Sequence, residues 1–99
     1  MTGWRTRELC IPAGHPSAAG HFPGNPIVPG ALLLDAAVAA IAGEGGAVIR
    51  AAKFLRPVRH GVLLELRWRP AGEGLFRFEC RLAEEVALAG TLECAGGPW

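Results

Sequence analysis

One stretch of sequence decides the fold, PGALLLDAAVAAIA at residues 29–42. Pro29 suits the first position of a helix, where a backbone N–H has no acceptor, and the glycines after residue 42 end the helix. Every side of this helix is apolar, and Asp35 carries its sole charge. A helix that is apolar on all sides is surrounded by other elements, so we predict one buried central helix over residues 29–42.

Around the helix, the sequence predicts an antiparallel sheet. Apolar and polar residues alternate with period two over Val62–Arg69, Leu75–Leu82 and Val86–Cys94, and short turns join these three strands. Ala47–Leu55 and Trp4–Ile11 add two more strands. The predicted fold class is therefore α+β, with a curved antiparallel sheet wrapped around one long central helix. The side chains predicted to face the helix are Leu64, Leu66, Trp68, Phe76, Phe78, Cys80, Leu82, Val86, Leu88 and Leu92.

The length and composition limit the possible functions. Ninety-nine residues leave room for a single domain over residues 1–99. Hydrophobic residues make up 51% of the chain against 19% charged, which is more apolar surface than so small a body can hide, so we expect a dimer. The formal charge of +1 provides no large basic surface for nucleic acid or for an anionic membrane.

Cysteine usage and the apolar runs indicate the compartment. Cys10, Cys80 and Cys94 are odd in number and form no C-x-x-C pair, so we expect them to be reduced core residues. The longest apolar run is too short to cross a bilayer and the N-terminus is polar, so we expect a cytoplasmic protein. Histidines and acids never cluster at metal-ligand spacing, so we predict no metal site, and we expect no other cofactor.

The chemistry is predicted in the loop that opens the helix, HFPGNPIVPG at residues 21–30. Its prolines and glycines make a stiff connection that holds a side chain and a row of N–H groups in one geometry. At Gly30, free N–H groups and the positive end of the helix dipole form a site for a carbonyl oxygen that gains negative charge. Asp35, about a turn and a half into the helix, is too deep to be a cap and needs a partner or a proton if it is buried.

Each of these features also has an ordinary structural explanation. His21 alone could be a loop histidine bonded to the backbone, and Asp35 alone could be a water-exposed acid at the edge of the helix. The run of prolines and glycines alone could be a connector rich in turns. The chemical interpretation depends on their occurring together, in one order and at one spacing.

In combination, these residues resemble the signature of the hot-dog-fold β-hydroxyacyl thioester dehydratases, which dehydrate 3-hydroxyacyl groups on acyl carrier protein. The signature stands here as GHFPGxPxxPG at residues 20–30, followed by an acid at Asp35. The segment KFLRPVxxG at residues 53–61 and the closing three strands are similar as well, so the resemblance covers most of the chain. The opening IPAGHP at residues 11–16 is most similar to the compact dehydratases of aryl-polyene and related pathways.

The resemblance implies a hydro-lyase that eliminates water from a 3-hydroxyacyl thioester to give a trans-2-enoyl thioester, in fatty acid or polyene biosynthesis. By this resemblance His21 removes the C2 proton, the N–H of Gly30 holds the thioester oxygen, and Asp35 helps to protonate the departing hydroxyl. In similar enzymes the histidine and the acid come from different subunits, so a monomer should be inactive. The further substrate-binding candidates, which are otherwise plain core residues, are Ala31, Phe22, Leu33 and Leu34.

The resemblance also implies partners. The expected carrier is an acyl carrier protein with a phosphopantetheine-linked substrate, and the expected assembly is a homodimer or a heterodimer with another hot-dog subunit. Arg50, Lys53, Arg56 and Arg59 form either a docking patch for the acidic carrier or an ordinary solvated strand face. Two alternatives to the dehydratase stay open, a hot-dog acyl thioesterase and a structural subunit of a heteromeric dehydratase. The acyl chain length, the choice between carrier protein and coenzyme A, and any isomerase activity stay open too.

Overall fold

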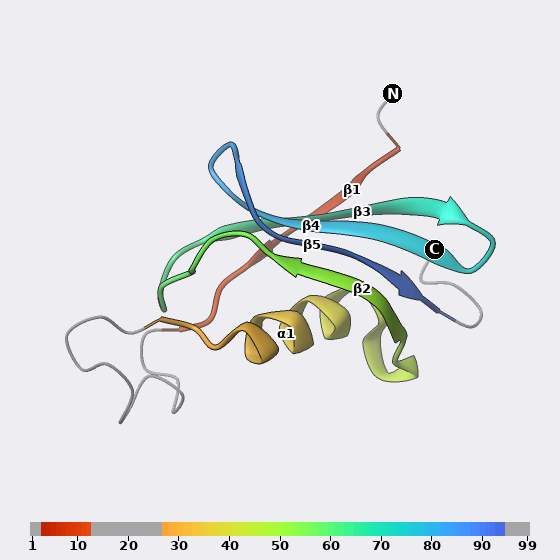
Figure 1. Cartoon of the computed structure of the whole chain (residues 1–99), viewed down its shortest axis with the longest axis horizontal. Helices are drawn as coiled ribbons and strands as arrows, with labels where there is room; N and C mark the ends of the chain where they lie inside the picture. The colour runs from red at the N-terminus through yellow and green to blue at the C-terminus, as the bar shows by residue number, and fades with distance from the viewer. Residues whose placement is uncertain (1–2, 13–26, 95–99) are drawn as a thin grey trace.

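A five-stranded antiparallel sheet and one long helix make up the fold (Figure 1), and the computed structural model describes residues 3–12 and 27–94. In chain order the elements are β1 (Arg5–Leu9), α1 (Gly30–Ala42), the 3-10 turn η2 (Gly43–Gly45), β2 (Val48–Phe54), β3 (Leu64–Gly72), β4 (Leu75–Leu82) and β5 (Glu85–Glu93). The strands lie in the order β1-β3-β4-β5-β2, and every neighbouring pair is antiparallel. Figure 1 shows α1 lying along one face of the curved sheet. The predicted architecture is therefore confirmed.

The core lies between α1 and the sheet. Leu33, Ala37 and Ile41 recur every fourth residue along α1 and are the buried residues of the helix. They belong to the same apolar cluster as the inward side chains of β3 and β4, of which Leu66 and Phe78 are fully buried. Burying a side chain of this size contributes about 1.5–3 kcal/mol. The predicted inward faces of β3 and β4 are confirmed, with only the last inward residue of β4 partly exposed.

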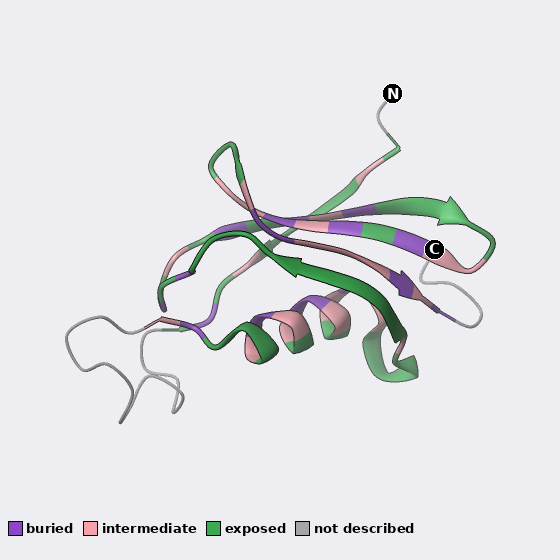
Figure 2. Cartoon of the chain, in the orientation of Figure 1, coloured by how far each residue is buried: buried purple, intermediate pink, exposed green. Residues whose placement is uncertain are grey.

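The helix is not surrounded within the single chain. Ala31, Asp35 and Ala39 lie about one turn apart along α1, and all three are exposed (Figure 2). The prediction of a helix covered on all sides is therefore wrong for one protomer, because the sheet covers one side and leaves the opposite side open. An apolar pattern shows that a surface avoids water, but it does not show which chain covers that surface. Within residues 3–12 and 27–94, no helix has the length and apolar character needed to cross a membrane.

Strand β5 departs from the predicted alternation at Ala87. Leu88 pairs with Cys80, but Val86 pairs with Arg81, so Ala87 is an extra residue and forms a β-bulge. The bulge places Val86 on the outer side with Arg81, whereas Ala87 is fully buried. The prediction that Val86 faces inward is therefore wrong. The bulge also directs a backbone carbonyl toward the end of β2, where two N–H groups donate to it.

Strand β2 forms an open edge of the sheet. It is the last strand in the sheet order, and all seven of its residues are exposed. Val48, Ile49 and Phe54 are large apolar side chains that keep 56%, 42% and 52% of their surface exposed. An edge strand also presents a row of unpaired backbone N–H and C=O groups. The β2 edge is therefore a surface suited to another protein chain.

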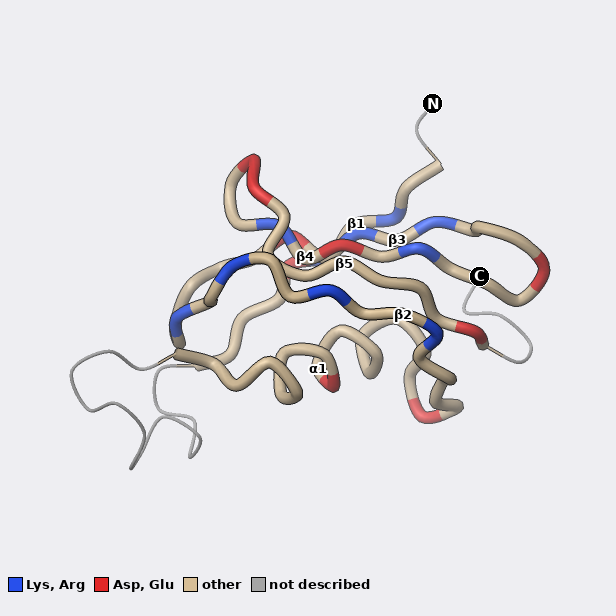
Figure 3. The backbone as a smooth tube through the Cα atoms, viewed as in Figure 1, with Lys and Arg blue, Asp and Glu red and all other residues tan. Residues whose placement is uncertain are grey.

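Charged residues recur along β1, β3 and β4 (Figure 3), and the contacts of one of them help to hold the start of the chain against the sheet. Arg67 of β3 lies beside Glu79 of β4, with 2.8 Å between Nη2 and Oε1. The ring of Trp4, which precedes β1, packs over the same guanidinium, 4.2 Å from its central carbon to the ring centroid. Such a cation–π contact contributes about 0.5–1 kcal/mol at an exposed site. These contacts help to hold the N-terminal strand against β3.

The three cysteines divide into one exposed and two buried thiols. Cys80 and Cys94 are buried and Cys10 is exposed, so the prediction that all three are core residues is wrong for Cys10. All three are free thiols. Burial raises the pKa of Cys80 from 9.0 to about 12, and burial also raises the pKa of Cys94. The buried pair should therefore be chemically inert in the folded protein.

We expect iodoacetamide at pH 8 to modify Cys10 quickly and the other two cysteines only after denaturation, because the thiolate is the reactive form. Mass spectrometry after brief exposure counts the adducts, and three adducts formed at one rate on the native protein would contradict the expectation.

The raised pKa of Cys80 also makes the stability of the folded protein depend on pH. The folded state keeps a proton that the unfolded chain loses, so this contribution to stability is full below pH 9.0 and declines as the pH rises toward about 12.

Candidate active site

The structure places only part of the predicted site. His21 and Phe22 lie outside the described residues, so their roles stay predictions. The other predicted site residues lie within the first six residues of α1, namely Gly30, Ala31, Leu34 and Asp35. The N-terminus of α1 is therefore where the geometry of the site can be examined.

The first backbone N–H groups of α1 point out of its N-terminal end. Pro29 has extended backbone angles, φ −56° and ψ 138°, and its carbonyl accepts the N–H groups of Leu32 at 3.0 Å and Leu33 at 3.1 Å. The N–H groups of Gly30 and Ala31 come before these two bonds, at the positive end of the helix dipole. The first turn contains no acidic residue, and no side chain of the described residues caps it. This turn can therefore stabilise a carbonyl oxygen that gains negative charge.

A mainly apolar pocket of about 400 Å³ lies against this turn. One wall is fixed by a 2.7 Å hydrogen bond from the N–H of Val28 to the carbonyl of Val58. The other is fixed by the N–H groups of Leu55 and Arg56, which donate to the bulge carbonyl of Ala87 at 2.8 Å and 3.3 Å. The lining includes Ile27, Gly30, Leu33, Phe54, Pro57 and Val58. The pocket thus has the size of a small-ligand site and walls suited to an acyl chain.

The predicted residues on α1 do not all meet in this pocket. Gly30 and Leu33 line it, whereas Ala31, Leu34 and Asp35 do not. Leu34 is half-buried and packs against the core. Asp35 is exposed in the single chain. This exposure agrees with the alternative explanation of Asp35 as a water-exposed acid at the edge of the helix. One chain therefore supplies a pocket at Gly30 but does not place its own acid in that pocket.

The sequence reasoning missed the wall opposite α1, which Phe54, Leu55 and Val58 form. In the sequence, the cations of this stretch indicate either a docking patch or a solvated strand face. The missed signal is the apolar pair Phe54 and Leu55, which comes just before the strand-ending Pro57. The wall also lies close to the α-carbon of Gly30. A Cβ atom built at Gly30 would lie 2.9 Å from the nearest ring atom of Phe54. A larger residue at this position would therefore have to displace the exposed Phe54 ring.

The basic stretch is only partly available to an acidic partner. Arg50 pairs with Glu93, and Nε of Arg56 lies 2.5 Å from Oε2 of Glu85. All four side chains are largely exposed, so each pair contributes about 0–1 kcal/mol. Acids of the same chain thus compensate two of the four cations, Arg50 and Arg56. For these two, the ordinary solvated strand face is favoured over the docking patch.

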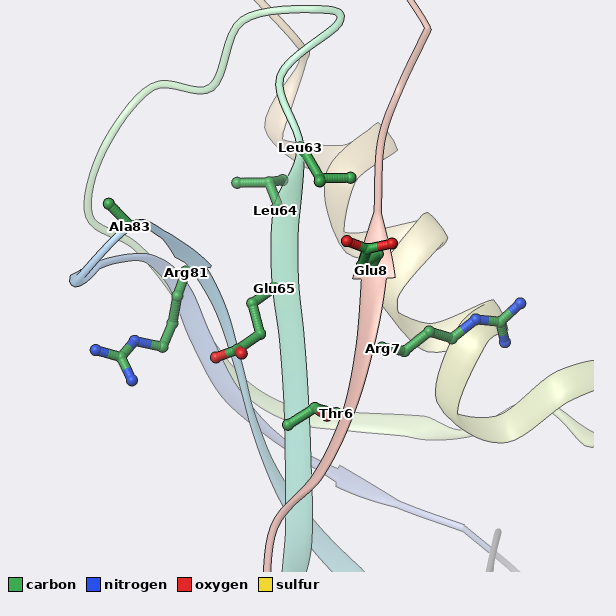
Figure 4. A pocket seen from close by; sticks show the side chains of 8 residues that line it. All are labelled: Thr6, Arg7, Glu8, Leu63, Leu64, Glu65, Arg81 and Ala83. Carbon is green, nitrogen blue, oxygen red and sulfur yellow. The ribbon is translucent and has the colours of Figure 1, made fainter.

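A second hollow, of about 470 Å³, lies over β1 and β3 (Figure 4). In that view Glu65 and Arg81 extend to one side of β3 and Arg7 extends to the other. The lining mixes charged and apolar groups and includes none of the described candidate residues. Among the described residues, no group of His, Cys, Asp or Glu side chains could hold a metal ion. We therefore place the candidate site at the N-terminus of α1.

A family model relates the chain to known proteins. The model of the ApeI-like family, described as the ApeI dehydratase, matches residues 5–91. The chain belongs to the ApeI-like dehydratase family. This ApeI-like chain is also 34% identical over 98 residues to the 3-hydroxyacyl-[acyl-carrier-protein] dehydratase FabZ of Blochmanniella pennsylvanica, across 81% of this chain and 65% of the relative. It is 38% identical over 103 residues to FabZ of Chloroflexus aggregans, across 86% and 70%. The chain spans about two thirds of the length of these curated relatives.

Solved structures show that the ApeI-like chain has the hot-dog fold. The dehydratase heterocomplex ApeI:P from Xenorhabdus doucetiae matches with a TM-score of 0.72 at 22% identity, over 96% of this chain and 90% of that chain. The fluoroacetyl-CoA thioesterase FlK matches with a TM-score of 0.58 at 15% identity, over 93% and 83%. The predicted hot-dog fold is confirmed. Because a dehydratase and a thioesterase share it, the fold alone does not determine the reaction.

Proposed function

We propose that the chain is a hydro-lyase that removes water from a 3-hydroxyacyl thioester on an acyl carrier protein and forms the trans-2-enoyl thioester. One observation carries the proposal: in a chain of the ApeI-like family, the GHFPGxPxxPG motif leads directly into the uncapped N-terminus of α1, where an apolar pocket opens. The FabZ relatives, which are named for this activity, support it. The reaction belongs to fatty acid or polyene biosynthesis in the cytoplasm.

The proposed mechanism divides the elimination among three groups. His21 removes the proton from C2, the resulting electron pair forms the C2–C3 double bond, and the C3–O bond breaks. Asp35 helps to supply the proton with which the hydroxyl leaves as water. The N–H of Gly30 stabilises the thioester oxygen while it carries negative charge. Leu33, which lines the pocket, binds the acyl chain in this proposal together with Phe22, whereas Ala31 and Leu34 do not line the pocket of their own chain.

We also propose that a second hot-dog subunit completes the site. Asp35 is exposed and does not line the pocket of its own chain, so the acid can serve the pocket of a neighbour. The open β2 edge provides a surface on which that neighbour can add a strand. The second subunit is either an identical copy or a different hot-dog chain, and the structural neighbour ApeI:P is a heterocomplex.

The test follows two products of one substrate. The purified chain is mixed with a 3-hydroxyacyl thioester on acyl carrier protein, and mass spectrometry measures the enoyl product while a separate assay measures the free carrier thiol. We expect the enoyl thioester to form without release of thiol. Thiol release without the enoyl product would overturn the dehydratase and identify a thioesterase. Enoyl formation only after another hot-dog subunit is added would identify a heteromeric enzyme.

A further inference from the structure

An aromatic ring covers the helix turn at which the proposed reaction takes place. Phe54 is the last residue of β2, and 52% of its surface is exposed. A Cβ atom built at Gly30 would lie 2.9 Å from Cε1 of this ring and 3.2 Å from two other ring atoms, so the ring faces the α-carbon of Gly30 closely. A ligand that enters the pocket against Gly30 therefore has the ring of Phe54 as a neighbour.

The backbone behind the ring is held in place, so the side chain is the adjustable part. In the β2–β5 pair, Phe54 lies opposite the fully buried Leu88. The next two N–H groups of the chain donate to the carbonyl of Ala87 at 2.8 Å and 3.3 Å. An exposed aromatic side chain on a fixed backbone can change its rotamer without moving the strand. The ring can therefore narrow or widen the pocket without any change of the fold.

We propose that Phe54 determines the acyl specificity of the site, by admitting unbranched acyl thioesters to Gly30 and excluding those that carry a bulky substituent close to the reacting carbons. The proposal rests on the proposed function. The pocket of about 400 Å³ is lined mainly by apolar side chains, so discrimination between acyl groups depends on shape and not on hydrogen bonds. A misfit of one or two carbon atoms in an apolar pocket changes kcat/KM by about 10–200-fold.

The first measurement compares two substrates. We expect Phe54→Ala to raise the ratio of kcat/KM for a 4-methyl-branched 3-hydroxyacyl thioester to that for the straight-chain thioester by about 10-fold or more. Phe54→Leu should have an intermediate effect. Leu63→Ala is the matched control, because it removes a similarly exposed apolar side chain that lies outside β2 and outside the pocket, and its ratio should equal that of the wild type. An unchanged ratio in an active Phe54→Ala variant would overturn the proposal.

A second measurement does not depend on turnover. The same chains are titrated with straight and branched 3-hydroxyacyl pantetheine amides, which carry the same acyl group but eliminate water slowly, because the C2 proton of an amide is less acidic than that of a thioester. A relative gain in branched-ligand affinity for Phe54→Ala supports the role of Phe54 even if no dehydration is observed, in which case only the proposed function fails. Equal relative affinities in the variant and the wild type, or no binding of either amide to any chain, would overturn the role of Phe54.

Discussion

We expect Asp35→Asn to lower the turnover of the proposed 3-hydroxyacyl-carrier thioester by about 10²–10⁴-fold, the contribution expected of one acid–base group. Asparagine keeps the size and polarity of the side chain but cannot take part in the proton transfer. Because Asp35 is exposed, the melting temperature should hardly change. The measurements are the initial rate of enoyl formation and thermal unfolding of the same preparation. Glu44→Gln, which neutralises an exposed acid in η2, is the control and should keep full activity.

Mixing two inactive variants tests whether the site is shared between subunits. A dimer of one His21→Ala chain and one Asp35→Asn chain contains one site with both mutations and one site with neither. Random exchange of subunits should therefore restore about a quarter of the wild-type activity in a homodimer. A fluorescence transfer signal between labelled chains shows that exchange has occurred. Exchange without recovery would show that His21 and Asp35 act within the same chain.

The second large effect concerns Gly90 in β5. A Cβ atom at this position would overlap the carbonyl oxygen of Ala51 in β2 and would lie 2.8 Å from the ring of Phe78. The ring cannot move away easily because Phe78 is fully buried. Gly90→Ala should therefore cost about 3 kcal/mol of unfolding free energy, the upper end of overpacking effects. For a domain of this size, that lowers the melting temperature by about 12–24 °C.

The control for this substitution is another glycine without neighbours. A Cβ atom at Gly45 would meet nothing within 4 Å, so Gly45→Ala should change the unfolding free energy by about 0.5 kcal/mol or less. Thermal unfolding of both variants at one protein concentration makes the comparison independent of assembly. Equal melting temperatures for the two variants would show that β2 and β5 are not in close contact at Gly90.

The strand alternation and the apolar helix pattern predicted most of the fold, because both patterns depend only on residues close together in the sequence. The strand Leu75–Leu82 has the predicted bounds, and the predicted helix over residues 29–42 differs from α1 by one residue. The alternation failed at Ala87, because a bulge depends on how two strands fit together and no single strand encodes it. The open side of α1 was missed for a related reason, since the apolar pattern is the same whether the cover is the same chain or another.

The part of the site that belongs to a sequence motif was predicted. The part that is formed only by tertiary packing was missed. Gly30 was identified by its place at the start of a helix, and the structure adds the pocket beside it. Phe54 was not identified, because it approaches Gly30 only after β2 has joined the sheet beside β5. Asp35 was predicted as an acid for a neighbouring subunit on a resemblance alone. Its exposure is compatible with that role, which the mixing experiment tests.

The open β2 edge bears on how the protein must be produced. A chain without a partner displays seven exposed strand residues with unpaired backbone groups, and such an edge can recruit identical copies into aggregates. Lys53 interrupts its apolar run and opposes the stacking of equivalent edges by like-charge repulsion, whereas the charge of Arg50 is compensated by Glu93. This protection is incomplete, since Val48 and Ile49 remain exposed in the same strand. In the heteromeric form of the proposed assembly, chains synthesised in excess of their partner are therefore the ones most open to aggregation and proteolysis, so balanced supply of the two subunits would govern the yield.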